Sequence, residues 1–154
     1  MAVASPPAVP HLECIPEAAS YHGVNALVVQ AIIWHESGNR HNIVVRNTNG
    51  SVDVGLGGIN SIHYTELRKY NVTPEQLLNG CVNAYVTAWL LSKKVARYGH
   101  TWEAVGAYHS ETPTLKRAYA ERIRRVIAGW HPEVASSYDL APHIPAQTPS
   151  TGQE

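Results

Sequence analysis

Residues 24–39 read VNALVVQAIIWHESGN, and this stretch decides the fold. Apolar side chains recur at the three- and four-residue spacing of an α-helix, and the opposite side of that helix is nearly as apolar. The first set is Val24, Leu27, Val28, Ala31 and Ile32, and the second is Val29, Ile33 and Trp34. A helix that is apolar all round is buried in the centre of a domain. We therefore predict a central helix over residues 24–37 that stops at Gly38.

The composition fits a single globular domain around that helix. The chain has 154 residues and a mass of 16.9 kDa, which suits one hydrophobic core and is short for two domains. Lys plus Arg and Asp plus Glu number 12 each, so the formal net charge is zero. This balance argues against nucleic-acid binding, which needs a basic surface. The most apolar run, residues 24–34, is too short and too interrupted for the roughly 18 residues of a membrane span.

Further helices are expected on both sides of the central one. Pro16 favours the first turn of a short helix that ends at Gly23. The remaining helical segments are predicted at residues 61–70, 73–79, 81–98, 102–109 and 114–129. Two sets of side chains are predicted to face inward from the two longest of these. They are Val82, Tyr85, Val86, Trp89 and Leu90, and Leu115, Ala118, Tyr119, Ile123 and Val126.

A β-hairpin is predicted only between residues 42 and 60. Val44 and Val45 precede the turn sequence NTNG, and Val52 and Val54 follow it. The glycine-rich sequence GLGGIN comes next, at residues 55–60. The predicted fold class is therefore mainly α with one small β flap.

Both ends of the chain are rich in proline and poor in large apolar residues. We expect residues 1–12 to form an arm, residues 13–130 the folded domain, and residues 131–154 a flexible tail. The first residues, MAVASPPAVP, lack the charged start and apolar stretch of a secretory signal, so no signal peptide is visible in this chain.

Glu36 interrupts the apolar pattern of the central helix. It lies four residues after Ile32, so the apolar row runs directly into a carboxylate. Apolar surroundings and the helix C-terminus both raise the pKa of such a group, which makes it a competent general acid near neutral pH. Alternatively, the side chain turns to solvent at the helix end or pairs with Arg40 or Arg46. The helix position alone leaves both interpretations open.

Other polar residues give weaker signals. The histidines at 35, 41, 63 and 109 form no HExxH pattern, so we expect no metal site. Asp53 is interpreted first as a turn residue and second as a further carboxylate for glycoside chemistry. The basic residues between 116 and 125 are interpreted as the solvated face of the last helix, and attraction of an anionic polymer is the alternative.

Four segments, taken in order, resemble the lysozyme-like lytic transglycosylases. They are AIIWHESGN, NTNGSVDVGLGGINSIH, LLNGCVNA and WEAVGAYHSETP, and the likeness covers residues 14–127. It is strongest to the small peptidoglycan-cleaving proteins that accompany bacterial type III and type IV secretion systems. The resemblance implies a lysozyme-like α+β fold, mainly helical around a central helix, with a β flap beside a glycan cleft. It also implies cleavage of the β-1,4 bond between N-acetylmuramic acid and N-acetylglucosamine, with a 1,6-anhydro product and no metal or cofactor.

The resemblance assigns roles to individual residues. Glu36 matches the catalytic acid, and Tyr108 matches a tyrosine that closes on it, although a core aromatic is the alternative for Tyr108. The residues expected to contact substrate are Ser37, Gly55, Leu56, Gly57, Gly58, Ile59, Asn60, His109 and Ser110. Three of these depart from the family pattern. Most relatives have a larger residue at Gly57, glutamine at Gly58 and asparagine at His109.

The resemblance also bears on the two cysteines and on the partners. It pairs Cys14 with Cys81 in a disulfide, which implies an oxidising compartment and favours the periplasm; two reduced core cysteines are the alternative. The expected partners are peptidoglycan strands and components of a secretion or conjugation apparatus, and we expect a monomer. Two other functions stay open: a hydrolase that uses Asp53 to position water, and a wall-binding assembly factor without catalytic activity.

Overall fold

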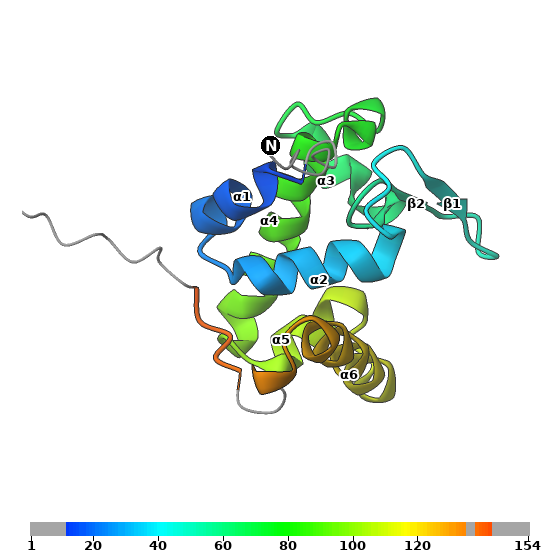
Figure 1. Ribbon diagram of the computed structural model, residues 1–154. Helices are drawn as coiled ribbons and strands as arrows, with labels where there is room; N and C mark the ends of the chain where they lie inside the picture. Colours follow the sequence, from blue (N-terminus) through cyan, green and yellow to red (C-terminus); the bar gives the residue numbers. More distant parts are fainter. Residues whose placement is uncertain (1–11, 135–137, 143–154) are drawn as a thin grey trace, which may run out of the picture.

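The computed structural model describes residues 12–134 and 138–142. The α-helices are α1 (Cys14–His22), α2 (Ala26–Ser37), α3 (Tyr64–Arg68), α4 (Gly80–Tyr98), α5 (Trp102–His109) and α6 (Pro113–Trp130). Short 3-10 turns are η1 (Ser61–His63), η2 (Glu75–Leu78) and η3 (Pro132–Val134). Helix α2 crosses the middle of the molecule, with α1 above it, α5 and α6 below it, and α4 passing behind it from the upper to the lower part (Figure 1). The predicted fold class, mainly α with a small sheet, is confirmed.

Helix α2 is the central helix predicted from residues 24–37. It starts at Ala26 because Asn25 caps it, with the Asn25 side chain accepting a hydrogen bond of 3.0 Å from the Val28 backbone N–H. Gly38 ends it in the left-handed conformation, at φ 61°. The residues Val28, Val29 and 31–33 are buried, whereas Leu27 is partly buried and Trp34 is 47% exposed. The all-apolar pattern therefore overstates burial at both ends of the helix.

The inward faces of the two longest helices differ in part from the prediction. In α4 the buried set is Gly80, Asn83, Ala84, Val86, Thr87, Ala88, Leu90 and Leu91, and in α6 it is Tyr119, Ile123 and Ile127. Leu115 is 50% exposed. It lies in the first turn of α6, and Ala118 in the next turn is exposed as well, so helical spacing alone misplaces both residues. Polar Asn83 and Thr87 are buried, whereas the expected Tyr85 and Trp89 are only partly buried. The two polar residues face inward because they support the glycine-rich loop described below.

The β flap is a three-stranded antiparallel sheet in the order β1-β2-β3. Strands β1 (Val44–Arg46) and β2 (Val52–Val54) form the predicted hairpin, which projects from the helices (Figure 1). Strand β3 (Ile59–Asn60) is the end of the glycine-rich sequence, and it places Asn60 opposite Asp53. The flap thus brings the glycine-rich loop back beside the end of α2.

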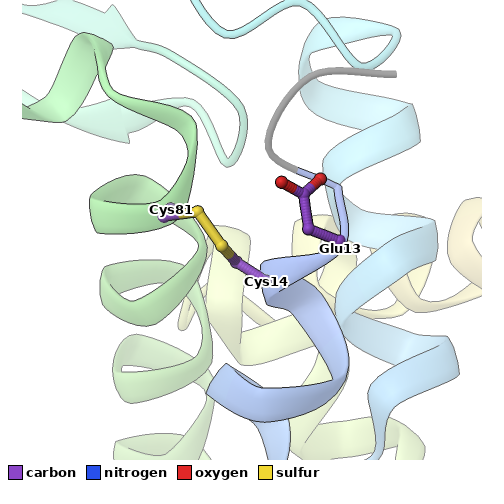
Figure 2. A group of neighbouring side chains, drawn as sticks. All are labelled: Glu13, Cys14 and Cys81. Atoms are coloured by element: carbon purple, nitrogen blue, oxygen red, sulfur yellow. A yellow bond between two sulfur atoms is a disulfide. The ribbon is translucent and has the colours of Figure 1, made fainter. Parts of the chain in front are cut away.

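A disulfide joins Cys14 in α1 to Cys81 in the first turn of α4, with the two Cα atoms 5.3 Å apart (Figure 2). This confirms the pairing implied by the resemblance. The carboxylate of Glu13 lies near the two sulfurs, and these three residues form the only group within the described residues that is compact enough to hold one metal ion. Because both sulfurs are bonded to each other, neither is available as a thiolate ligand.

The chain packs against the core again after α6. Leu140 is buried, and the Asn25 side chain donates a 2.9 Å hydrogen bond to the carbonyl of Ala141. Residues 138–142 belong to the segment expected to be a tail, yet they cover the start of α2. The expected arm at residues 1–12 lies outside the described residues except for Leu12, and so does the rest of the tail from residue 143. None of the described helices is long and apolar enough to cross a membrane.

Candidate active site

A cleft of about 730 Å³ lies between the end of α2, the sheet, and the C-terminal end of α5. It is lined by His35, Glu36, Asn47, Asn49, Ser51, Asp53, Gly58, Ile59, Asn60, Ile62, His63, Leu90, Lys94, Ala107, Tyr108, His109, Ser110 and Glu111. Its lining combines carboxylates, amides, hydroxyls and imidazoles, so it offers many hydrogen-bond donors and acceptors. Another hollow, of about 550 Å³, lies between α1, α3 and α4, and its lining is almost entirely apolar and aromatic with no carboxylate. Of these two hollows, only the first cleft therefore contains carboxylates that could act as acid or base.

Glu36 lies in the last turn of α2, partly buried at the wall of the cleft. The hydroxyl of Tyr119 donates a hydrogen bond of 3.1 Å to its Oε1. Burial raises the pKa of Glu36 to about 7, the hydrogen bond from Tyr119 opposes this rise, and the nearby charge of Asp53 adds to it. The alternative ion pair is absent from the described residues, where the Arg40 Nε instead donates to the carbonyl of Ser37 at 2.7 Å. Burial is thus the main cause of the rise in the pKa of Glu36, as the apolar pattern of the helix predicts.

Asp53 faces the same cleft from strand β2. Its two oxygens accept hydrogen bonds from the side-chain amides of Asn47, at 3.0 Å, and Asn60, at 2.8 Å. The preferred interpretation of Asp53 as a turn residue is therefore wrong. The turn ends earlier, where the side chain of Asn49 accepts from the Ser51 N–H, so Asp53 falls within the strand. Asn47 and Asn60 hold the Asp53 carboxylate in a fixed orientation.

The glycine-rich loop is held in place from behind by α4. Asn83 is fully buried, and its amide donates to the carbonyls of Val54 and Leu77, both at 2.9 Å. Its Oδ1 accepts a 2.8 Å hydrogen bond from the Gly57 N–H. A Cβ at Gly57 would overlap the hydroxyl of Thr87, so glycine lets the loop lie directly on α4. The sequence analysis missed Asn83 and Thr87. Two polar residues four positions apart on the buried face of a helix could have indicated that they bind a neighbouring backbone.

Gly58 brings the loop backbone against Glu36. Its φ is +59°, and a Cβ built there would lie 2.7 Å from the Glu36 Oε2. Oε2 is therefore the oxygen that lies against the loop, while Oε1 is held by Tyr119. A side chain at position 58 would be strained and would crowd the acid, so glycine suits this site.

The structure brings only part of the predicted substrate-binding set to the cleft. Gly58, Ile59, Asn60, His109 and Ser110 line it. Four other predicted contacts, Ser37, Gly55, Leu56 and Gly57, are buried outside the cleft lining.

Each of these four has a structural reason to lie there. The Ser37 hydroxyl is turned back into α2, where it donates to the carbonyl of Ile33 at 3.0 Å. The Gly55 N–H donates to the carbonyl of Ile43, and Leu56 fills the core. Gly57 lies against α4. These residues therefore support the cleft rather than contact its contents.

Two tyrosines approach Glu36 from different helices. Tyr108 was predicted to close on the acid, but its hydroxyl donates to the carbonyl of Gly57 at 2.8 Å and so fixes the loop. Tyr119, predicted only as a core residue of α6, makes the hydrogen bond to Glu36. Burial, followed by the charge of Glu36, raises the pKa of both hydroxyls, so both remain protonated donors. His35 and His109 pack on the Tyr119 ring, at centroid distances of 5.3 and 5.0 Å.

Comparison with known proteins identifies the family of this chain. The model of the family described as "Transglycosylase SLT domain" matches residues 13–128. The chain belongs to the SLT transglycosylase family. It is 34% identical to the Invasion protein IagB of Salmonella typhimurium over 116 residues, and this match covers 72% of each chain. It is 35% identical over 125 residues to the Protein IpgF of Shigella flexneri (76% of this chain, 82% of that protein) and 34% identical over 124 residues to the X polypeptide of Escherichia coli (76% and 73%). Because members of this family are lytic transglycosylases, the protein is a peptidoglycan lytic transglycosylase.

Changing Tyr119 to Phe is expected to move the pH profile of this SLT transglycosylase. The hydroxyl stabilises the carboxylate form of Glu36, so its loss raises the Glu36 pKa further above about 7. The alkaline limb of the rate profile therefore shifts to higher pH, and the maximal rate falls about tenfold because Glu36 loses its orientation. The measurement is the rate of glycan cleavage between about pH 5 and 9, the range over which such a carboxyl titrates. An unshifted alkaline limb would show that Tyr119 has no influence on the acid.

Proposed function

We propose that this SLT transglycosylase cleaves the β-1,4 bond between N-acetylmuramic acid and N-acetylglucosamine and forms a 1,6-anhydro end, with Glu36 as acid and then as base. One observation carries the proposal: Glu36, whose carboxyl pKa is raised to about 7, lines the cleft with one oxygen held by Tyr119 and the other beside Gly58. Near neutral pH such a group can both give and take a proton.

The reaction needs one carboxyl and no water. Protonated Glu36 gives its proton to the glycosidic oxygen as the bond to the anomeric carbon breaks. The resulting carboxylate then takes the proton of the C6 hydroxyl of the muramic acid, and the C6 oxygen bonds to the anomeric carbon. The acetamido group of the sugar can stabilise the positive charge between these steps. Tyr119 keeps Glu36 in one rotamer throughout, and Tyr108 holds the loop that faces it.

The mass of the products tests the proposal. Digestion of purified sacculi is expected to release muropeptides with 1,6-anhydro ends, which are lighter by one water than the reducing ends left by hydrolysis. Reducing ends as the main product would overturn the transglycosylase reaction. A variant with Asp53 changed to Asn serves as the comparison, because it removes the second acid and leaves Glu36 in place.

A lysozyme-type hydrolase is the second candidate, and the placement of Asp53 favours it. The carboxylate lies in the cleft, held by Asn47 and Asn60, where a second acid would position water or stabilise a sugar cation. If this function is correct, wild-type protein yields reducing ends and the Asn variant loses most of its activity. If the transglycosylase reaction is correct, the Asn variant retains the anhydro product.

The third candidate is a wall-binding assembly factor without catalytic activity, which the absence of glutamine at position 58 suggests. Gly58 is compatible with an intact acid, because a Cβ at this position would lie only 2.7 Å from Glu36 Oε2. Binding to sacculi with no release of soluble fragments is the result that would support a wall-binding factor.

We also infer that the protein acts in the periplasm, where a secretion or conjugation apparatus crosses the wall. Two observations support this: the Cys14–Cys81 disulfide suits an oxidising compartment, and the match to the Invasion protein IagB covers most of the chain. Local cleavage of peptidoglycan would make room for such an assembly.

A further inference from the structure

An ion pair lies at the wall of the cleft, between α4 and the segment that follows α5. The Lys94 ammonium contacts Oε1 of Glu111 at 2.9 Å, and both side chains line the cleft. Among the described residues that line it, Lys94 is the only lysine or arginine. Leu90, one helical turn earlier in α4, lines the cleft as well, so Lys94 continues the wall that this helix forms. The proposed reaction uses neither member of the pair.

Glu111 is held in place by donors on both of its oxygens. The hydroxyl of Tyr98 donates a hydrogen bond to Oε2, and the Arg97 guanidinium lies 3.6 Å from the same oxygen. The hydrogen bonds from Tyr98 and Lys94 lower the pKa of Glu111 to about 2, so the group is an ionised acceptor at neutral pH. The position and the charge of this carboxylate are therefore fixed before any ligand arrives.

The pair keeps unused hydrogen-bonding capacity. An ammonium has three N–H donors, and the described residues provide one acceptor for Lys94, which is Oε1 of Glu111. A carboxylate oxygen can accept two hydrogen bonds, and within the described chain Oε1 accepts only the one from Lys94. The two side chains are 32% and 41% exposed. An adjacent donor and acceptor are thus open to a ligand in the cleft.

The pair is set apart from Glu36 along α4. Thr87 of this helix lies against Gly57, in the loop that meets the acid at Gly58. From residue 87 to residue 94 an α-helix rises by about 10 Å. The pair is therefore placed to contact a sugar away from the bond that breaks, and it acts on binding rather than on the chemical step.

A donor beside an acceptor suits an uncharged N-acetylglucosamine. In a β-1,4 glycan this sugar has a C3 hydroxyl, which can donate to Glu111, next to the acetamido carbonyl on C2, which can accept from Lys94. In N-acetylmuramic acid the C3 oxygen is an ether and has no hydrogen to donate. The lactyl group on that oxygen also places a carboxylate or a peptide where Glu111 lies. A site that is built to bind a hydroxyl discriminates against a ligand that lacks it.

We propose that Lys94 and Glu111 bind an N-acetylglucosamine unit of the glycan and so fix which of the two alternating sugars lies at this end of the cleft. This rests on the proposed function, since it assigns a further sugar contact to the same cleft. Both are specificity residues, and neither takes part in bond cleavage.

Binding of uncharged oligomers of N-acetylglucosamine tests the site without any carboxylate on the ligand. The titrations use the Glu36→Gln chain, so that no bond is cleaved during the measurement. Adding Glu111→Gln or Lys94→Met is expected to raise the Kd about five- to tenfold, because each change removes a charge-assisted hydrogen bond to the sugar. With Glu36 intact, the same changes are expected to raise KM for sacculus glycan and leave kcat unchanged, as loss of uniform binding does.

Glu66→Gln is the matched control. Glu66 forms the same kind of ion pair with Lys93, at 2.8 Å and with similar exposure, but both lie outside the residues that line the cleft. Its affinity for the oligomer is expected to equal that of the Glu36→Gln chain alone. The melting temperatures of all these variants are expected to lie close together, because exposed ion pairs contribute little to stability.

Three results would overturn the proposal. The first is no measurable binding of the uncharged oligomer, and the second is an affinity that Glu111→Gln and Lys94→Met leave unchanged or that Glu66→Gln lowers equally. The third is a loss confined to peptide-free glycan from sacculi, which has a carboxylate on each muramic acid, because Lys94 would then bind an anion.

Failure of the proposed function is a separate result. Wild-type protein that releases no fragments from sacculi contradicts the reaction, whereas the titrations measure the sugar site in the absence of cleavage. Weaker binding of the uncharged oligomer in both variants of the pair, with the control unchanged, supports the site whichever reaction Glu36 performs.

Discussion

Changing Glu36 to Gln is expected to lower the rate of glycan cleavage by about a hundred- to ten-thousandfold, the usual contribution of a positioned general acid. The amide has nearly the same shape and can still accept the hydrogen bond from Tyr119, but it has no proton to give to the glycosidic oxygen. Release of soluble muropeptides from sacculi is the measurement. Glu66→Gln is the control, because that carboxylate pairs with Lys93 outside the cleft and its loss leaves the rate unchanged. Full activity in the Gln variant would refute the assignment of the acid.

The same substitution is expected to stabilise the fold at alkaline pH. The pKa of Glu36 is raised from 4.5 to about 7 on folding, so the wild-type fold loses stability as pH rises between these values. The loss is complete above pH 7 and amounts to roughly 3 kcal/mol. Gln cannot ionise, so the variant should be more stable than wild type by about this amount at about pH 8, one unit above the raised pKa, and equally stable at about pH 4. Urea unfolding at the two pH values measures the difference, and a less stable variant at pH 8 would contradict the argument.

Removing the disulfide is expected to give the largest loss of stability. Cys14 and Cys81 are separated by 67 residues, and opening a loop of this length lowers the free energy of unfolding by about 4 kcal/mol in the chain-entropy model. The variant with both cysteines changed to Ala should therefore melt about 10 °C or more below wild type. A reducing agent should lower the melting temperature of wild type and leave that of the variant unchanged. A loss below about 1 kcal/mol would show that α1 and α4 are held together mainly by their packing.

The central helix and its acid could be predicted from the sequence because both depend on local spacing. A helix that is apolar on both faces must be buried, and a carboxylate in the same row then meets an apolar environment. The period of the pattern also gives the position of Glu36 relative to the helix end. The rise in its pKa follows from these two facts without any knowledge of its neighbours.

The partners of Glu36 could not be predicted in the same way. Tyr119 has the spacing of a core aromatic, and nothing in α6 shows that its hydroxyl meets an acid 83 residues earlier. Asp53 was assigned to a turn because NTNG and its flanking residues suit a turn, but the turn closes before Val52. Whether a polar residue faces a cleft depends on pairing between strands, which the local sequence does not fix.

The glycine-rich loop shows a different limit. The resemblance assigns all of residues 55–60 to the glycan site, whereas only its second half, from Gly58, lines the cleft. The first half is bound to Asn83, a contact across 26 residues that local reasoning cannot anticipate. Only the three-dimensional structure shows which residues of this short motif line the cleft and which ones support it.

The pKa of Glu36 tests the account most directly. Carbon-13 NMR of the full chain, with Glu36 identified by its loss in the Gln variant, gives the titration midpoint of this carboxyl without any substrate. The account predicts a midpoint near 7, the value set by burial at the end of α2. A midpoint near 4.5, the ordinary value, would mean that Glu36 is freely solvated and would contradict its role as the acid.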